Sequence, residues 1–291
     1  MNLVRFGPAG NSESFSAMGY KKTVQVPEYL EKMGLNAYEY QCGRGVRVNV
    51  DAAAELGRLA AARDIAISLH APYFISLSST EEEKRENSIG YILDSARAVA
   101  AMGGSRIVVH SGSCSKMTRQ EALELACATL RRAEQVLCEN GLEQIHICPE
   151  TMGKVNQLGT LEEVLELCRV DDRFIPCIDF GHLNARTFGG LRTFADFKAV
   201  FDAMEDRLGR DRMRLFHSHF SRIEYTENGG EKRHLTFEDK IFGPDFEPVA
   251  ELVCQKGCTP TIICESAGTQ AEDAAAMREM YRAAARRGGT V

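Results

Sequence analysis

Four of the seven histidines in this chain of 291 residues end, or closely follow, short apolar runs of the kind that form buried β-strands. A fifth lies in a long connection after one of these runs. In chain order the five are His70, His110, His182, His219 and His234. Imidazole is a common ligand of zinc, manganese and iron(II) in proteins. The spacing therefore predicts a metal site, provided that the runs bring these side chains to one place.

Carboxylates continue the same series. Glu150 and Glu265 end two further runs, and Asp179 ends the run that His182 follows, so six consecutive candidate strands, the third to the eighth, finish in His, Asp or Glu. One such residue is usually a core hydrogen-bonding group or a helix cap, but its recurrence on six strands favours metal ligation. Five histidines and three carboxylates exceed what one tetrahedral ion needs. We therefore expect two or three Zn²⁺ ions, with Mn²⁺ or Fe²⁺ as alternatives, sharing a bridging carboxylate.

The two remaining histidines lie inside candidate strands. Strand alternation places His146 on the same face as Glu150, and His217 on the same face as His219 but one layer deeper. We expect both to support the ligands or to pack in the core rather than to bind metal.

Apolar runs and amphipathic stretches alternate along the whole chain. The eight candidate strands are Leu3–Gly7, Ala37–Gln41, Ile65–His70, Arg106–His110, Gln144–Glu150, Phe174–Asp179, Met213–His219 and Thr261–Glu265. The candidate helices are Pro27–Met33, Asp51–Arg63, Thr80–Ala101, Thr118–Glu139, Thr160–Arg169, Thr193–Leu208, Pro248–Lys256 and Gln270–Arg287. Ser79 and Thr80, followed by glutamates, form a helix-capping signature.

Eight strand–helix repeats predict an α/β fold, a (β/α)8 TIM barrel in a single domain over residues 1–291. A barrel brings all strand C-termini to one face, where the predicted ligands would meet. A doubly wound open sheet gives the same alternation, but usually with fewer strands and often a glycine-rich turn after the first. No periodic helix is evident between Phe220 and Gly243, and so long a connection is usually functional or disordered.

Composition narrows the class of protein. Apolar residues make up 44% and charged residues 26% of the chain, and the net charge is -6, which argues against a non-specific DNA-coating protein. The ten cysteines form no CxxC pair, and those in candidate strands, Cys177 and Cys264, are expected to be core residues. No signal peptide or membrane-spanning run of roughly 18 apolar residues is evident. We expect a monomeric cytoplasmic protein with free thiols and no membrane partner.

Several ordered motifs carry a family resemblance. They are LHAPYFISL (69–77), VVHSGS (108–113), PETMGKVNQLG (149–159), IDFGHLNA (178–185), HFSR (219–222), RH (233–234) and ICES (263–266). At these residues the chain resembles the endonuclease IV family of metal-dependent abasic-site endonucleases, within the xylose-isomerase-like barrel superfamily. The motifs span about two thirds of the chain and are more specific for fold and metal site than for substrate.

The resemblance implies a three-zinc centre. It assigns His70, His110 and Glu150 to the first ion, Glu150, Asp179, His219 and Glu265 to the second, and His182 and His234 to the third. The family's third ion also takes an aspartate two residues before the second histidine, in a DRH motif. This chain reads EKRH, with Lys232 in that place. Either Glu231 substitutes through a backbone shift, or the third ion is weakened or absent and the Lys232 ammonium stands near its place.

The same resemblance implies an activity and a partner. The enzyme would be a hydrolase that cuts the phosphodiester 5′ to abasic sites in DNA, with Glu150 as the bridging and catalytic residue. Tyr73 matches a family position that packs against distorted DNA. After the second strand the family's DNA-probing residues are missing, which leaves Arg44 and Arg47 as the obvious DNA contacts.

Two other functions stay open. A metal-dependent sugar isomerase or epimerase of the same superfamily would use a carboxylate pair, such as Glu150 and Glu265, to move a proton. It needs fewer histidines than this chain carries. A non-catalytic metal-binding barrel is the third possibility, supported by the lysine at position 232.

Overall fold

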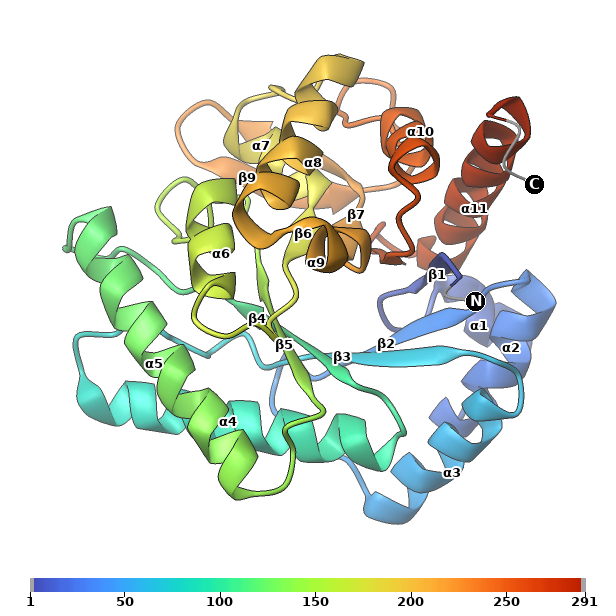
Figure 1. Ribbon diagram of the computed structural model, residues 1–291. Helices are drawn as coiled ribbons and strands as arrows, with labels where there is room; N and C mark the ends of the chain where they lie inside the picture. Colours follow the sequence, from blue (N-terminus) through green and yellow to red (C-terminus); the bar gives the residue numbers. More distant parts are fainter. Residues whose placement is uncertain (1–2, 289–291) are drawn as a thin grey trace.

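All eight candidate strands join one sheet in the computed structural model, which describes residues 3–288. The strands are parallel and run in the order β1-β10-β7-β6-β5-β4-β3-β2. Their bounds are β1 (Arg5–Pro8), β2 (Ala37–Gln41), β3 (Ala66–His70), β4 (Arg106–His110), β5 (His146–Glu150), β6 (Cys177–Asp179), β7 (His217–Phe220) and β10 (Thr261–Cys264). Helices surround the sheet (Figure 1). The predicted single-domain (β/α)8 barrel is confirmed for the described residues.

Contacts between β1 and β2 bring the two edges of the sheet together. The Gly10 amide donates to the Glu39 carbonyl at 2.9 Å, and the Asn36 amide donates to the Phe6 carbonyl at 3.1 Å. Gly7 permits this approach, because a Cβ at that position would lie 1.8 Å from the Ala37 carbonyl oxygen. The barrel is therefore closed by main-chain packing that only glycine tolerates here.

The outer layer is made of helices that begin mainly at polar caps. Thr118, Thr160 and Thr193 each form a capping box with an acidic residue three positions later, as their sequence patterns indicate. The helical elements are α1 (Glu13–Ala17), the 3-10 turn η1 (Thr23–Gln25), α2 (Val26–Met33), α3 (Val50–Ala61), α4 (Glu82–Ala101), α5 (Arg119–Glu139), α6 (Leu161–Cys168), α7 (Phe180–Arg186), α8 (Phe194–Leu208), α9 (Arg210–Arg214), α10 (Glu247–Lys256) and α11 (Gln270–Arg287).

Three local predictions were wrong. Met213 and Arg214, the predicted start of the seventh strand, belong to α9, and the strand begins at His217. The sixth strand is shortened to Cys177–Asp179, since Pro176 has no amide hydrogen to donate to a neighbouring strand. Neither Ser79 nor Thr80 caps α4, whose N-cap residue is Glu81.

The long connection after β7 contains a hairpin rather than a helix. Strands β8 (Arg222–Thr226) and β9 (Gly230–Leu235) pair antiparallel, outside the barrel sheet. Asn228 and Gly229 in the turn are a common hairpin signal that the sequence interpretation missed. The hairpin brings residues 231 and 234 to the mouth of the barrel, where they line the same hollow as the strand ends.

The described residues include no helix that is both long and apolar enough to span a membrane. All ten cysteines are free, and Cys177 and Cys264 are fully buried, as predicted for core residues.

Candidate metal centre

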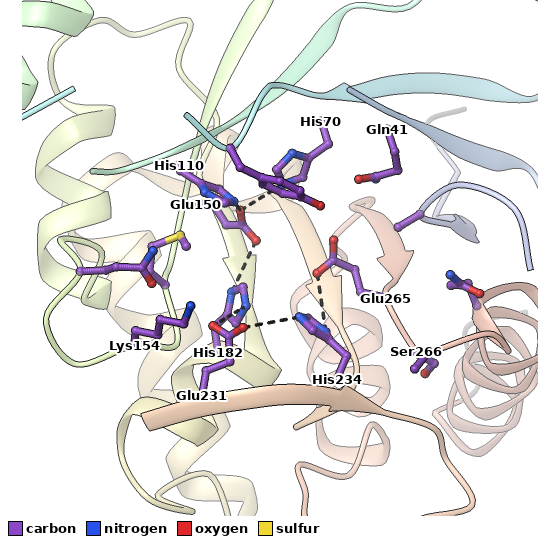
Figure 2. A pocket seen from close by; sticks show the side chains of 16 residues that line it. Gln41, His70, His110, Glu150, Lys154, His182, Glu231, His234, Glu265 and Ser266 are labelled. Carbon is purple, nitrogen blue, oxygen red and sulfur yellow. Dashed lines mark ion pairs between the residues drawn. The ribbon is translucent and has the colours of Figure 1, made fainter. Parts of the chain in front are cut away.

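A hollow of about 650 Å³ opens at the C-terminal ends of the barrel strands. Its lining includes His70, His110, Glu150, His182 and Glu265, which point toward one another in Figure 2. Asp179 and His219 lie beneath this surface, both completely buried. The strand-end residues predicted as ligands are thus brought together at one mouth.

Glu150 is the centre of the arrangement. Its Oε2 atom lies 3.5 Å from His70 Nε2 and 3.4 Å from His110 Nε2. Its Oε1 atom lies 2.9 Å from His219 Nδ1 and 3.5 Å from His182 Nδ1. Oε2 is buried and has no hydrogen-bond partner among the described residues. One carboxylate therefore separates two sets of histidines, which is the geometry a bridging ligand needs.

Asp179 joins two parts of the site. Its Oδ1 atom caps α7 by accepting a 2.7 Å hydrogen bond from the His182 amide. Its Oδ2 atom is buried and lacks a hydrogen-bond partner in the described chain. Ligand atoms of Asp179, Glu150, His182 and Glu265 all lie within 4.8 Å of one another. Unpartnered buried carboxylate oxygens are costly unless a cation or donor meets them, so this set suits a divalent ion.

A third group of ligand atoms forms where the hairpin meets α7: those of His182, His234 and Glu265 lie within 4.8 Å of one another, and Glu231 faces both histidines. Glu231 Oε2 lies 3.4 Å from His182 Nε2, and Glu231 Oε1 lies 3.9 Å from His234 Nε2 (Figure 2). In a regular strand, residues three apart point to opposite faces. Here β9 contains a bulge: Arg233 pairs with Glu224, but Tyr225 pairs with Glu231. The extra residue brings Glu231 and His234 to the same face.

Lys232 is the residue that the bulge turns away from the site. Its ammonium lies 2.5 Å from Glu224 Oε1, and the Arg233 guanidinium lies 2.6 Å from the other oxygen of the same carboxylate. Of the two outcomes that the EKRH sequence left open, the structure adopts the one in which Glu231 faces the two histidines.

Two glycines allow the hairpin to approach the loop after β5. A Cβ on Gly153 would lie 2.6 Å from Glu231 Cβ and 2.9 Å from His182 Cδ2. Gly230 has φ +75° and passes so close to the Gly153 carbonyl that a Cβ would lie 2.3 Å from its oxygen. Larger residues at either position would push Glu231 away from His182.

Hydrogen bonds fix the histidine rings. His70 Nδ1 lies 2.8 Å from the Ala71 carbonyl, and His182 Nδ1 lies 2.9 Å from the Thr151 carbonyl. Because a carbonyl only accepts, each ring carries its hydrogen on Nδ1 and leaves Nε2 free toward the hollow. The ring orientation is therefore the one a metal ligand requires.

The electrostatics of the site couple imidazoles to carboxylates. Burial lowers the pKa of His182, but the Asp179, Glu150 and Glu231 carboxylates outweigh it and hold that pKa well above its ordinary value. Burial lowers the pKa of His110 to about 4. Burial also raises the pKa of Asp179. Positive charge on the buried imidazoles balances these concentrated carboxylates. Bound divalent cations would take over that role.

Comparisons with known proteins identify the family of this chain. Residues 27–285 match the model of a family described as xylose isomerase-like TIM barrel. The chain belongs to this family. It is 34% identical over 264 residues to an uncharacterised protein, MJ0133, of Methanocaldococcus jannaschii, covering 91% of this chain and 92% of that protein. It is 29% identical over 194 residues to a probable endonuclease 4 of Mycoplasma genitalium. That alignment covers 64% of this chain and 61% of the relative.

Two solved structures with the same fold carry different functional names. A D-tagatose 3-epimerase-like protein superposes with a TM-score of 0.72 at 18% identity, covering 98% of both chains. Endonuclease IV from Thermus thermophilus gives a TM-score of 0.64 at 20% identity, covering 97% of this chain and 99% of the other. At 18% and 20% identity, these superpositions show that the fold is shared, and they do not assign an activity. The predicted resemblance to endonuclease IV is confirmed by the family match and the sequence relatives.

Of the three residues predicted to contact DNA, only Tyr73 lines the hollow in this member of the family. Its side chain is 58% exposed, and its ring lies 5.4 Å from that of His110 in a stacked arrangement. Arg44 and Arg47 are exposed on the loop between β2 and α3. Arg47 borders a separate hollow, while neither arginine lines the one that holds the histidines.

Sequence reasoning missed Glu39, which lies on β2 below the mouth. It is fully buried, and its Oε2 atom accepts hydrogen bonds from His217 Nε2 at 3.0 Å and Ser68 Oγ at 2.9 Å. The available signal was an acidic residue in the middle of an otherwise apolar and aromatic strand, AYEYQ. His146 behaves differently from His217: its Nδ1 lies 2.7 Å from the Arg173 carbonyl, away from the ligands.

Proposed function

We propose that this protein is a metal-dependent phosphodiesterase that hydrolyses DNA on the 5′ side of abasic sites. The observation that carries the proposal is the third ligand group, formed by His182, Glu231 and His234 next to the Glu150 centre. A phosphodiester develops negative charge on several oxygens during hydrolysis, which adjacent cations stabilise. Sugar isomerisation needs fewer ions, and therefore fewer histidines.

The ligand set supports two or three ions, with Zn²⁺ as the proposed metal and Mn²⁺ or Fe²⁺ as alternatives. His70, His110 and Glu150 would hold the first, Asp179, His219, Glu265 and Glu150 the second, and His182, Glu231 and His234 the third. Bound ions would supply the positive charge that stabilises the reacting phosphoryl group.

The chain's own residues supply position and charge. Burial raises the pKa of Glu150, but His219 and His182 outweigh it and hold that pKa well below its usual range. The carboxylate is therefore ionised at neutral pH and can bridge two cations. Tyr73, at the rim, offers an aromatic face to an unpaired or distorted nucleotide, because base–aromatic stacking does not depend on sequence. Arg44 and Arg47, on the neighbouring loop, are proposed to contact the phosphate backbone.

The test is cleavage of a duplex oligonucleotide that contains one abasic-site analogue, with the undamaged duplex as control. We expect cleavage 5′ to the lesion, leaving a 3′-hydroxyl and a 5′-deoxyribose phosphate, and loss of activity after chelation. Metal content by elemental analysis should give two or three ions per chain. Metal-loaded protein that leaves the abasic duplex intact would contradict the proposal.

One observation favours a second candidate, a sugar epimerase or isomerase. Glu150 Oε1 and Glu265 Oε1 lie 2.9 and 3.4 Å from the same atom, His219 Nδ1, which gives a carboxylate pair of the kind that moves a proton. Turnover of ketoses by protein that does not cut DNA would support this candidate.

A further inference from the structure

We propose that Glu39 is a positioning residue of the metal centre, which fixes the proton on His219 Nε2 so that Nδ1 is free to bind metal. The inference rests on the metal centre of the proposed function but not on its substrate. Glu39 reaches the centre from β2, a strand that contributes none of the predicted ligands. Its side chain is completely buried, as is that of His219.

The imidazole of His219 lies between two sets of carboxylates. Its Nδ1 atom faces the mouth, 2.9 Å from Glu150 and 3.4 Å from Glu265, while its Nε2 atom lies 2.9 Å from Glu39 Oε1. A neutral imidazole carries one hydrogen and one lone pair. If Nδ1 supplies the lone pair to a metal, the hydrogen must be on Nε2. This atom is buried without a hydrogen-bond partner among the described residues, and Glu39 Oε1 is the carboxylate oxygen that lies 2.9 Å from it.

His219 differs in this respect from two other histidines of the centre. His70 and His182 place their Nδ1 atoms against main-chain carbonyls, which are neutral acceptors. His219 has a carboxylate behind it and would therefore be a more basic ligand. Its ring is also reversed, with Nδ1 rather than Nε2 toward the mouth.

Glu39 is itself held in place by its second oxygen. Oε2 accepts from His217 Nε2 at 3.0 Å and from Ser68 Oγ at 2.9 Å. His217 and His219 are two apart on β7, so both side chains point to the same face of the strand. With Oε2 engaged, Glu39 cannot turn both oxygens toward a cation. This explains why a carboxylate so near the centre would act behind His219 and not as a ligand.

The alternative role is direct ligation. Ligand atoms of Glu39, His219 and Glu265 lie within 4.8 Å of one another, so the group could in principle hold an ion. The two roles give different results on substitution. Loss of a direct ligand removes an ion or changes its coordination number, whereas loss of a positioning carboxylate weakens binding by about 10–100-fold with the ion count retained.

The experiment compares Glu39→Gln with wild type and with Ser68→Ala, which removes one hydrogen bond to Oε2 and leaves the His219 contact. Metal-free full-length protein is titrated with Zn²⁺ against a chromogenic chelator, and bound zinc is counted at saturation. We expect unchanged stoichiometry in all three proteins. Affinity at one site should fall about 10–100-fold in Glu39→Gln and less than about threefold in Ser68→Ala.

Two further measurements separate positioning from a general structural role. With Co²⁺ in place of zinc, Glu39→Gln should shift the visible d–d absorption bands, while Ser68→Ala should not. Thermal unfolding of the metal-free proteins checks that each variant folds. If Glu39→Gln does not fold, His217→Asn, which loosens the anchor of Glu39, should show a smaller loss of zinc affinity in the same direction.

Wild-type affinity with an unchanged cobalt spectrum in a folded Glu39→Gln protein would overturn the inference. Loss of one zinc per chain would also overturn it, in favour of direct ligation. Because the readout is metal binding, a failure here is distinct from a failure of the wild-type protein to cut abasic DNA.

Discussion

The ligand groups of the mouth are supported in two different ways. The group around Glu150 is carried by the ends of barrel strands, whose hydrogen-bonded register fixes the height of each side chain: His110 pairs with Glu150, and Asp179 with His219. The third group depends on a hairpin outside the barrel and on one bulge within it. The comparison teaches that the barrel makes the first arrangement almost unavoidable, whereas the second depends on local backbone geometry that a single residue can change.

The largest effect on activity is expected when the group around Glu150, carried by the ends of the barrel strands, is disrupted. Glu150→Gln keeps the shape of the side chain but removes the charge that four histidines face. We expect the rate of abasic-site cleavage to fall by at least about 100-fold, the scale seen when a principal electrostatic element is lost. Single-turnover cleavage under saturating zinc measures it. A near-normal rate would remove Glu150 from the mechanism.

The third group, which the hairpin carries and which we call the hairpin-borne group, should lose zinc affinity when Glu231 is changed. It should keep that affinity when Lys232 is lost. Glu231→Gln should lose one zinc per chain, or weaken it by about 10–100-fold, because the carboxylate between His182 and His234 is gone. Deleting Lys232 removes the bulge but leaves Glu231 and His234 two apart, so a regular strand would again place them on one face.

Elemental analysis and zinc titration of both proteins check this pair of expectations. Lys232→Ala serves as the control for loss of the ammonium alone, since that group pairs with Glu224 away from the site. If the deletion lost as much zinc as Glu231→Gln, the spacing of Glu231 and His234 along the strand would not be what forms the third site.

A smaller effect is expected at Lys154, which lines the hollow beside the hairpin-borne group (Figure 2). Its backbone is fixed by Arg186, whose guanidinium donates to the Lys154 carbonyl at 2.7 Å and to those of Met152 and Gln157. Nearby Lys232 and Arg233 are instead engaged by Glu224. Lys154 is therefore the better candidate for contact with a substrate phosphate.

Lys154→Met should lower the affinity for abasic DNA by about three- to tenfold and reduce the slope of log affinity against log salt by about one. Fluorescence anisotropy at several salt concentrations measures both values. An unchanged salt dependence would argue that this lysine meets no phosphate.

The smallest effect on the centre is expected from a change in the outer layer. Thr193 caps α8 through a capping box with Asp196, and neither residue lines the hollow that holds the histidines. Thr193→Ala should destabilise the protein by about 1 kcal/mol. Chemical denaturation gives this value, and zinc stoichiometry and cleavage rate should remain those of the wild type. Loss of metal in this variant would link the outer helices to the centre.

Periodicity and residue type were enough to predict the barrel and the convergence of the side chains that end its strands. Parallel strands of a closed barrel must finish on one face, so His70, His110 and Glu265 met as expected. The bulge at residue 232 could not be predicted, because a register shift is set by contacts between the two strands of the hairpin, such as those of Glu224 with Lys232 and Arg233. Glu39 was missed for a related reason, since its partners His217 and Ser68 come from strands remote in the sequence.

The dual contact of Asp179 has a mechanical consequence. One oxygen of this carboxylate starts α7, and the third residue of that helix is His182, which belongs to the hairpin-borne group. A cation bound to the other oxygen, Oδ2, would displace the first turn of α7, which carries the His182 imidazole. Metal binding at the two adjacent sites is thus coupled through a single turn of backbone. An ion bound at one site should change the affinity of the other site for its ion.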